Sequence, residues 1–311
     1  MKPFKITLLF ALAAAVLLSL AGCMSFSISS TYDNADKYSA GNAEFSEGIS
    51  ALDIDWSSGT VNVTRHDQNT VSVSEANSAD LSEDRRVHTW LDGKTLHIRF
   101  CKSGDISFSE STEKKLEVRL PRDLKLDSVS YSCSSADTCF EGIDANDFKA
   151  DSSSGKLELK DCSAKEFSLD TSSGNILLSQ KGEADKITVD TSSGSVEMDL
   201  ETVKDIKLDS SSGDRRITAG KAEYVTSNTS SGRTELTFGS TPTEIKHESS
   251  SGDIILRLPK DAGFKAVVDT SSGKFSSEIP TAMEGDTYTA GSGSCRISAD
   301  TSSGDIDIRI A

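Results

Sequence analysis

The chain has 311 residues, with 33 basic and 49 acidic side chains and a formal net charge of −16 at neutral pH. An acidic surface repels phosphate backbones, which argues against nucleic-acid binding and against electrostatic docking on anionic lipid. Hydrophobic residues make up 35% of the chain, enough for a core, and no stretch beyond residue 22 is apolar for long enough to cross a bilayer.

Residues 1–22 have the pattern of an export signal. Lys2 and Lys5 form a basic start, and the apolar run that follows ends in Leu20-Ala21-Gly22-Cys23. This ending resembles the lipobox of bacterial lipoproteins, which implies cleavage before Cys23 and lipidation of that residue. The alternative is an ordinary secretory signal with a chance cysteine. We expect a protein that is lipid-anchored in the cell membrane or outer membrane and exposed outside the cytoplasm.

Two regions follow before the regular part of the chain. Residues 23–46, rich in Ser, Asn, Asp and Gly, are predicted to be a flexible tether. Residues 47–131 contain several segments that alternate apolar and polar side chains, and Asp92-Gly93 between two of them is a hairpin signal. We expect residues 47–131 to form a strand-rich N-terminal cap of a repeat domain over residues 132–311.

A unit of about 20 residues repeats through residues 132–311. It consists of an acidic or amide residue, one variable residue, Ser-Ser-Gly and a short apolar segment, as in Asp170-Thr-Ser-Ser-Gly174. A degenerate copy ends at Ala136, and Gly59 marks an earlier copy. A fixed period of this length is typical of stacked repeat proteins. The glycines of the regular copies are Gly155, Gly174, Gly194, Gly213, Gly232, Gly252, Gly273 and Gly304.

Apolar and polar residues alternate on both sides of each glycine, which is the period of a β-strand. One unit cannot bury its apolar face alone, whereas stacked units pair each strand with neighbours above and below. The sequence therefore predicts an all-β fold, a β-solenoid with two short strands in each rung.

The turn residues carry three further expectations. Each glycine should adopt a positive φ at a corner where a side chain would strike the next rung. Ser and Thr hydroxyls at the variable position should hydrogen-bond along the stack. A substitution of Gly194 to valine should therefore be costly, whereas the outward Asn175 should tolerate the same change.

Two features interrupt the regular pattern. The segments 116–121 and 254–259 both end in Leu-Pro and are followed by a basic residue and Asp, so each is predicted to mark a corner where the chain leaves the regular rung. Between Gly273 and Gly304 the spacing lengthens to 31 residues. We expect an inserted loop or hairpin within residues 280–291, before a closing rung around Gly304.

The strand-rich opening, the Leu-Pro element and the repeated Asp-Thr-Ser-Ser-Gly resemble the bacterial DUF4097 family, whose members are called putative adhesins. The resemblance covers residues 47–311. It implies a β-solenoid on an exported or membrane-attached protein, in some cases linked to envelope-stress systems. It implies no catalytic residue.

Five cysteines besides Cys23 remain, an odd number that cannot all pair within one chain. The register places Cys133 inward and Cys139 outward, which disfavours a bridge between them, and buried or idle thiols are the simplest interpretation. The chain has no Cys-x-x-Cys spacing, so a metal site at the cysteines is not expected. The five are Cys101, Cys133, Cys139, Cys162 and Cys295.

Nothing in the sequence indicates a nucleophile or a cofactor. The histidines are scattered, and His247 falls at an inward position, where a packed side chain is expected. The Ser-rich turns lack the Gly-x-Ser-x-Gly pattern of hydrolases. We expect no catalytic residue and no cofactor.

Six aspartates at the first position of the unit are in phase. The simple interpretation is that they are solvated acids that cap the N–H groups of the Ser-Ser turns. The alternative is a weak site for a hard cation such as Ca²⁺, because a turn offers carboxylate, hydroxyl and carbonyl oxygens together. The six are Asp151, Asp170, Asp190, Asp209, Asp269 and Asp300.

Three functions remain open at the level of sequence. The first is an exported, lipid-anchored cell-surface protein with a non-catalytic binding or adhesin-like domain, whose partner is an envelope glycan or protein. The second is an envelope-stress or signalling component that binds another membrane protein. The third is a carbohydrate-active β-helix enzyme with paired carboxylates, although nearly every carboxylate here belongs to the repeat, so no pair can be singled out.

Overall fold

The computed structural model describes residues 31–46, 48–77, 81–104 and 114–311. The chain divides into two compact units. The first comprises residues 1–33 and 103–111, and within its described part the backbone N–H of Tyr32 donates to Ser103 Oγ at 3.0 Å. The second comprises residues 34–102 and 112–311 and contains all of the described strands. The predicted export signal and Cys23 lie outside the described residues.

Within the described residues the structure has two 3-10 helices, η1 (Ala35–Lys37) and η2 (Glu83–Arg85), and no α-helix. No helix in this part of the chain is long and apolar enough to span a membrane. The strands up to the Ala136 turn are β1 (Ser39–Ala40), β2 (Ala43–Phe45), β3 (Ala51–His66), β4 (Val71–Asn77), β5 (His88–Asp92), β6 (Thr95–Arg99), β7 (Lys114–Pro121) and β8 (Leu126–Glu141).

The remaining strands carry the repeats and the C-terminal end of the stack. They are β9 (Ala145–Ser152), β10 (Leu157–Cys162), β11 (Glu166–Thr171), β12 (Ile176–Thr191), β13 (Val196–Ser210), β14 (Arg215–Ser231), β15 (Thr234–Phe238), β16 (Glu244–Ser251), β17 (Ile254–Leu258), β18 (Phe264–Thr270), β19 (Phe275–Ser277), β20 (Ala282–Glu284), β21 (Thr287–Ala290), β22 (Cys295–Ser303) and β23 (Ile306–Ile310).

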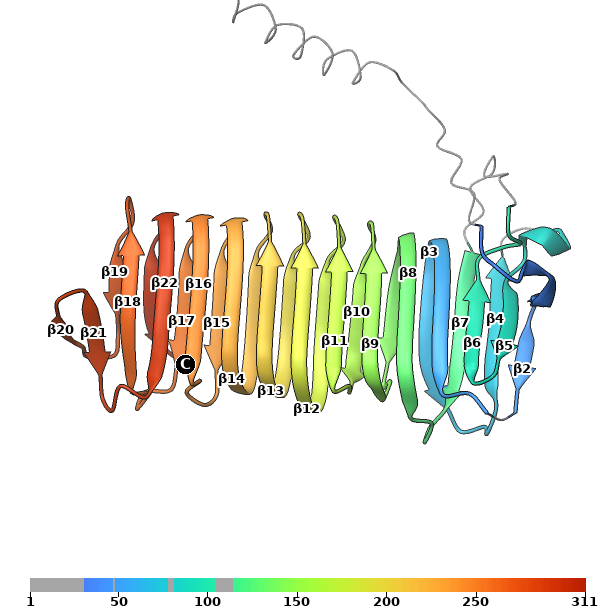
Figure 1. Cartoon of the computed structure of the whole chain (residues 1–311), viewed down its shortest axis with the longest axis horizontal. Helices are drawn as coiled ribbons and strands as arrows, with labels where there is room; N and C mark the ends of the chain where they lie inside the picture. Colours follow the sequence, from blue (N-terminus) through green and yellow to red (C-terminus); the bar gives the residue numbers. More distant parts are fainter. Residues whose placement is uncertain (1–30, 47, 78–80, 105–113) are drawn as a thin grey trace, which may run out of the picture. The chain divides into compact units, whose positions relative to one another are not determined.

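The repeats stack as a parallel β-solenoid, which confirms the predicted fold class (Figure 1). We name each rung by its turn glycine, or by Ala136 in the degenerate copy. A rung has one strand before the turn and one after it. Residues at the same distance from the turn pair from rung to rung, so that Leu169 of β11 lies opposite Val189 of β12. The alternating inward side chains of all rungs form one continuous hydrophobic core.

The stack begins earlier than predicted. β3 pairs in parallel with β8 from Ala51 to Val63, so the Gly59 rung is a regular member of the stack rather than part of a separate cap. The end of the stack is formed by β6 and β7, which pair in parallel with the two halves of β3. β5 and β4 then pair antiparallel with β6 and β7 and cover this end. The hairpin predicted at Asp92-Gly93 is the β5–β6 connection.

The predicted tether over residues 23–46 is wrong for its last part. β1 pairs with β5, and β2 pairs with β4, both antiparallel. The polar composition of this segment resembles a linker, yet its backbone hydrogen bonds are satisfied at the edge of the terminal hairpin strands. Residues 23–30 lie outside the described residues.

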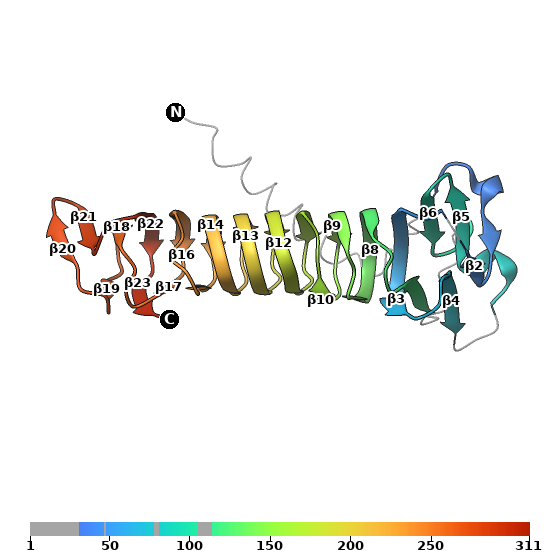
Figure 2. The same ribbon diagram turned by 90° about the horizontal axis from the view of Figure 1, so that it is seen from below.

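The order of rungs at the C-terminal end also differs from the prediction. β16 and β17 pair with β22 and β23, and β18 and β19 lie on the far side of that rung. The Gly304 rung therefore lies between the Gly252 and Gly273 rungs, as β22 does between β16 and β18 in Figure 2. The expected hairpin near residues 280–291 exists as β20 and β21, and β21 pairs antiparallel with β18.

The two Leu-Pro elements lie where the chain passes over a rung. After Pro121 the chain leaves β7 and continues in β8, with β3 between them. After Pro259 it leaves β17 and continues in β18, and the rung between them is filled later by β22 and β23. In both places the proline carbonyl accepts a hydrogen bond from the backbone three residues on, from Leu124 and Ala262.

Candidate functional site

A row of acidic side chains follows the edge of the stack where the strands enter the Ser-Ser-Gly turns. The register confirms that they are in phase, because each lies opposite the next in the parallel pairing. We call this row the carboxylate edge. In spatial order it comprises Asp151, Asp170, Asp190, Asp209, Asn228, Glu248, Asp300 and Asp269.

A hollow of about 480 Å³ lies on this edge between the Gly194 and Gly304 rungs. Its lining is polar, and it contains four carboxylates from the edge together with Asn228 and the Ser and Thr residues of the turns. The four carboxylates are those of Asp190, Asp209, Glu248 and Asp300. A surface with this lining suits a cationic or hydrogen-bonding ligand rather than an apolar one.

The carboxylates of this edge have different electrostatic environments. Burial raises the pKa of Asp170, and the neighbouring charges of Asp151 and Asp190 raise it further. Burial alone would also raise the pKa of Asp209, but hydrogen bonds from Lys207 and Asn228 lower it. Lys207 Nζ lies 2.7 Å from Asp209 Oδ2. Repulsion between in-phase acids is thus relieved at Asp209 and remains at Asp170.

The structure gives no support for a metal site at these aspartates. Among the residues that it describes, no three His, Cys, Asp or Glu side chains are close enough together to hold a metal ion. The parallel register places one carboxylate on each rung, about 4.8 Å from the next, so the ligands are spread along the stack. Hard cations require several oxygens around one point.

Most turn hydroxyls with a partner bond within their own rung, so the expected column of hydroxyls along the stack is found only in part: Thr270 Oγ1 donates to Gly304 O of the neighbouring rung at 3.0 Å. In one arrangement the hydroxyl accepts from the glycine N–H, as Thr191 Oγ1 does from Gly194 N at 3.0 Å. In the other it donates to the carbonyl before the glycine, as Ser210 Oγ does to Ser212 O at 2.9 Å. The hydroxyl before the glycine makes the contact between rungs, for example Ser212 Oγ to Ser192 O at 3.3 Å.

The glycines are required at every rung, but not always for their φ. Gly213 has φ +112° in the second arrangement, whereas Gly194 in the first has no positive φ. A Cβ on Gly194 would lie 1.7 Å from Gly174 O, and one on Gly213 would lie 2.3 Å from Gly194 O. In both cases the added Cβ would strike a backbone oxygen of the neighbouring rung, and no flexible side chain could move aside. The close approach of the backbones is therefore the reason that the turns share for requiring glycine, whereas the positive φ is found only in some of them.

In alternate rungs the side chain of the residue after the glycine accepts a hydrogen bond from a backbone N–H of the next rung. The sequence predicts this capping role for the aspartates of the carboxylate edge instead. Asn175 Oδ1 accepts from Ser195 N at 3.0 Å and from Ser195 Oγ at 2.9 Å. Asp214 Oδ1 accepts from Arg233 N at 2.9 Å in the same way. Asn175 therefore contacts the next rung, and the prediction that it tolerates a change to valine stays a prediction. The available signal was that an Asp or Asn follows the turn in alternate rungs, at residues 137, 175, 214 and 253.

The other singled-out side chains lie away from this edge. The five cysteines of the described residues form no disulfide with one another. Cys133 is buried and Cys139 half-buried, in keeping with their predicted orientations, and burial raises the pKa of Cys162 and Cys295 to about 12. Thiols with such pKa values are poor nucleophiles at neutral pH. His247 is buried, as expected.

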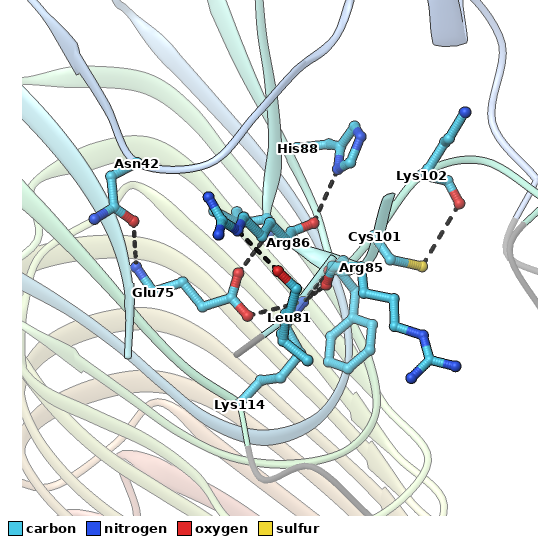
Figure 3. Close-up of polar contacts among 11 residues, drawn as sticks. Asn42, Glu75, Leu81, Arg85, Arg86, His88, Cys101, Lys102 and Lys114 are labelled. Carbon is cyan, nitrogen blue, oxygen red and sulfur yellow. Dashed lines mark hydrogen bonds and ion pairs between the residues drawn. The ribbon is translucent and has the colours of Figure 1, made fainter. Parts of the chain in front are cut away.

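Sequence reasoning missed a buried polar cluster at the N-terminal end of the stack (Figure 3). Lys114 Nζ lies 3.0 Å from Glu75 Oε1, and the two side chains are only 3% and 2% exposed. Lys114 Nζ also donates to the carbonyls of Arg85 and Phe100 and lies 5.0 Å from the centre of the Trp56 ring. Such an ion pair closes the open end of the core with satisfied polar groups.

A family profile and several solved structures match most of the chain. The profile of the family described as Toastrack DUF4097 matches residues 49–309. No curated protein matches the chain. A putative adhesin from Parabacteroides distasonis is 14% identical, with 86% of this chain and 95% of that chain covered and a TM-score of 0.52. A putative adhesin from Parabacteroides merdae is 12% identical, with 88% and 96% covered and a TM-score of 0.44.

A third solved structure carries a different description. It is a putative lipid binding protein from Parabacteroides distasonis, 14% identical, with 87% of this chain and 97% of that chain covered and a TM-score of 0.39. At these identities the likeness shows the fold alone, and only the first structure is similar enough to be used for that. None of the three is described as an enzyme.

Proposed function

Because the chain belongs to the Toastrack DUF4097 family, we propose that it is a non-catalytic binding protein, exported and lipid-anchored through Cys23, whose carboxylate edge docks a basic segment of another envelope protein. The observation that carries the proposal is the in-phase row of acids with a hollow of about 480 Å³ over four of them. The names of the structural neighbours are consistent with a binding role.

The absence of catalysis is part of this proposal, and the side chains around the edge support it. Glycosidases separate the roles of two carboxylates by giving them different environments within one cleft. Here the edge carboxylate whose pKa is raised, Asp170, does not line the hollow, and the hydroxyls of turns such as those at Thr191 and Ser210 are already engaged in hydrogen bonds. Among the described residues, the hollow is lined by no histidine.

The net charge of the protein favours a basic binding partner. Cleavage before Cys23 would leave 31 basic and 49 acidic residues, a net charge of −18. Such a surface attracts cationic partners over several ångströms and repels acidic glycans and phosphates. Lysine and arginine side chains can reach carboxylates on successive rungs, and several weak exposed contacts then act together.

The test uses the full chain and a fluorescent lysine-rich peptide as the probe. Changing Asp190→Asn, Glu248→Gln and Asp300→Asn together should weaken binding at low salt by roughly tenfold or more. The matched control, Glu166→Gln, Glu183→Gln and Asp185→Asn, removes the same charge from exposed positions that do not line the hollow, at the start of β11 and within β12. It should change binding only slightly. Equal losses in the two variants would reduce the effect to net charge and contradict a specific docking edge.

Anchoring is tested separately. The wild-type protein should partition into the detergent phase, and Cys23→Ala should remain unprocessed or appear in the aqueous phase, because lipid attached at Cys23 supplies the apolar anchor. Wild-type protein with unmodified Cys23 in the aqueous phase would overturn the lipid anchor and leave the docking proposal standing.

A further inference from the structure

Three successive rungs carry polar side chains inside the stack. At the position two residues after the glycine, the inward column contains Leu157, Ile176 and Val196, then Arg215 and Thr234, and then Ile254. At the position five residues before the glycine, the column contains Leu169, Val189 and Leu208, then Ser227 and His247, and then Ala299. The four polar side chains are at most 2% exposed.

Arg215 is a buried cation that makes no direct ion pair with a carboxylate among the described residues, although the charges of Asp214 and Asp209 act on it. Its Nη1 donates to Asn228 O at 2.9 Å, and its Nη2 donates to Thr234 Oγ1 at 2.6 Å. Its Nε has no acceptor within the described part of the chain. Burial lowers the pKa of Arg215 to about 10, which leaves the guanidinium charged at neutral pH. A buried charge without a counter-charge is costly, and such groups are normally paired.

His247 and Ser227 lie beside this guanidinium. Ser227 precedes Asn228, whose carbonyl Arg215 contacts, and it pairs in register with His247 on the next rung. Both ring nitrogens of His247 and the hydroxyl of Ser227 lack a hydrogen-bond partner among the described residues. Burial, aided by the charge of Arg215, lowers the pKa of His247 to about 3, so the ring is neutral and keeps one N–H donor. Unsatisfied buried groups of this kind are rare in folded proteins and call for an explanation.

We propose that the interior between β14, β15 and β16 binds one small monovalent anion, chloride in a physiological salt solution, through Arg215, Ser227 and His247. Each of these side chains can offer a donor, N–H or O–H, toward the same ligand. A cation is excluded by the guanidinium. A water molecule would satisfy the donors, but it would bring no negative charge into contact with the guanidinium, whose only carboxylate neighbours in the described part of the chain, Asp214 and Asp209, act without a direct ion pair. This is why the ligand we infer is an anion.

The position of the site also predicts how it is occupied. The three side chains lie on consecutive rungs and are closed off from solvent, so the ion must enter when these rungs stack or open. A ligand that binds only the folded state raises its stability in proportion to the logarithm of its concentration. Chloride should therefore raise the melting temperature of the protein beyond the effect of ionic strength.

The first experiment compares thermal unfolding of the full chain in sodium chloride and in sodium gluconate at equal ionic strength. The wild type should melt higher in chloride, by roughly 2 °C or more. Arg215→Met should lose this difference, and Ser227→Ala should reduce it. The matched control is Arg216→Met, because the neighbouring Arg216 is 67% exposed and points away from the core. Equal melting temperatures for the wild type in the two salts would overturn the proposal.

The second experiment does not depend on the folding of any variant. Crystals of the wild type grown in sodium bromide should show an anomalous bromide peak beside Arg215 Nε. A water molecule at that position, with no bromide, would show that the cluster is hydrated and would contradict the anion site.

Discussion

The strands in the middle of the stack and those at its two ends have their backbone groups paired in different ways. From the Ala136 rung to the Gly252 rung, each rung pairs with the next one in sequence, and from Gly155 onward the turns approach so closely that only glycine fits. At both ends the outermost rung is not the first or last in the sequence, and antiparallel strands cover it (Figure 1). The repeat pattern is therefore sufficient to add rungs in the middle of the stack, but each end requires strands that do not follow the pattern.

The physical reason is the unpaired edge. Inside the stack every strand has a neighbour on each side, whereas a terminal rung would expose a row of N–H and C=O groups to pairing with other chains. The chain removes this hazard by passing over one rung after Pro121 and Pro259 and by adding hairpin strands outside. The N-terminal end also closes the core with the buried Lys114–Glu75 pair.

The two tryptophans make the middle and the N-terminal end distinguishable in solution. Trp56 and Trp90 lie in β3 and β5, near the N-terminal end, so tryptophan fluorescence reports that end. Circular dichroism reports all strands. In stacked repeats distant rungs can unfold separately, so the two signals need not coincide.

The largest effect is expected in the middle, for Gly194→Ala. The added Cβ would lie 1.7 Å from Gly174 O, so two rungs must move apart, and we expect a loss of more than about 4 kcal/mol. Urea unfolding followed by circular dichroism should shift more than unfolding followed by fluorescence. The control is Gly182→Ala in β12, the strand before the Gly194 turn, where a Cβ meets nothing within 4 Å and only the positive φ costs about 1 kcal/mol. Equal losses would contradict close packing of the turns.

The next largest effect is expected at the N-terminal end, for Lys114→Met. It would remove the buried ammonium group that lies 3.0 Å from the Glu75 carboxylate, at a cost of about 3–5 kcal/mol. The fluorescence midpoint in urea should fall more than the circular-dichroism midpoint, the reverse of Gly194→Ala. Adding Glu75→Leu to Lys114→Met should restore much of the lost stability, because no unpaired charge remains. A double variant that is no better than the single one would count against the ion pair.

A moderate effect is expected for Asn175→Ala. The variant loses two hydrogen bonds from Ser195, worth about 1 kcal/mol in total at an exposed site. The control is Lys156→Ala, at the same turn position on the preceding rung, whose side chain makes an exposed ion pair with Glu158 and should matter by less than about 0.5 kcal/mol. If both variants melt like the wild type, the caps between rungs contribute nothing to stability.

The smallest effect is expected on the carboxylate edge, for Asp170→Asn. The pKa of Asp170 is raised in the folded protein, first by burial and then by Asp151 and Asp190, so its ionised form disfavours folding. This destabilisation is present above the folded pKa and disappears as the pH falls below the unfolded value near 3.9. Asp170→Asn should therefore stabilise the protein by a few tenths of a kcal/mol at pH 7 in low salt, because the side chain is exposed. A gain that persists at pH 3 in urea titrations would exclude repulsion as the cause.

Much of the regular stack could be predicted because its signals are local. The alternation around Gly174 and Gly194 fixes which side chains point inward, and the constant spacing puts Asp170 and Asp190 in phase. The structure confirms both of these predictions. The role of Asn175 was missed because an outward polar residue has the same pattern whether it is idle or caps the next rung.

The buried cluster of Arg215, Ser227 and His247 shows a second limit of prediction from the sequence. Position two after the glycine predicts that Arg215 points inward, and position five before it predicts the same for His247. Whether these groups meet a carboxylate, another polar group or no protein partner at all depends on side chains that converge from different rungs. That information is not contained in the sequence of any one repeat.

By itself the sequence determined the β-period, the length of a rung and the inward columns, because each of these depends on residues close together in the chain. Only the tertiary structure decided the order of rungs at the ends, the ordered strands at residues 39–45 and the partner of Lys114. Some rungs lie next to the preceding rung in the sequence, and others fill a place that the chain passed over earlier. Both kinds bury the same faces and form the same strand pairing. They differ only in long-range contacts and in how the last edge is covered, which no local pattern records.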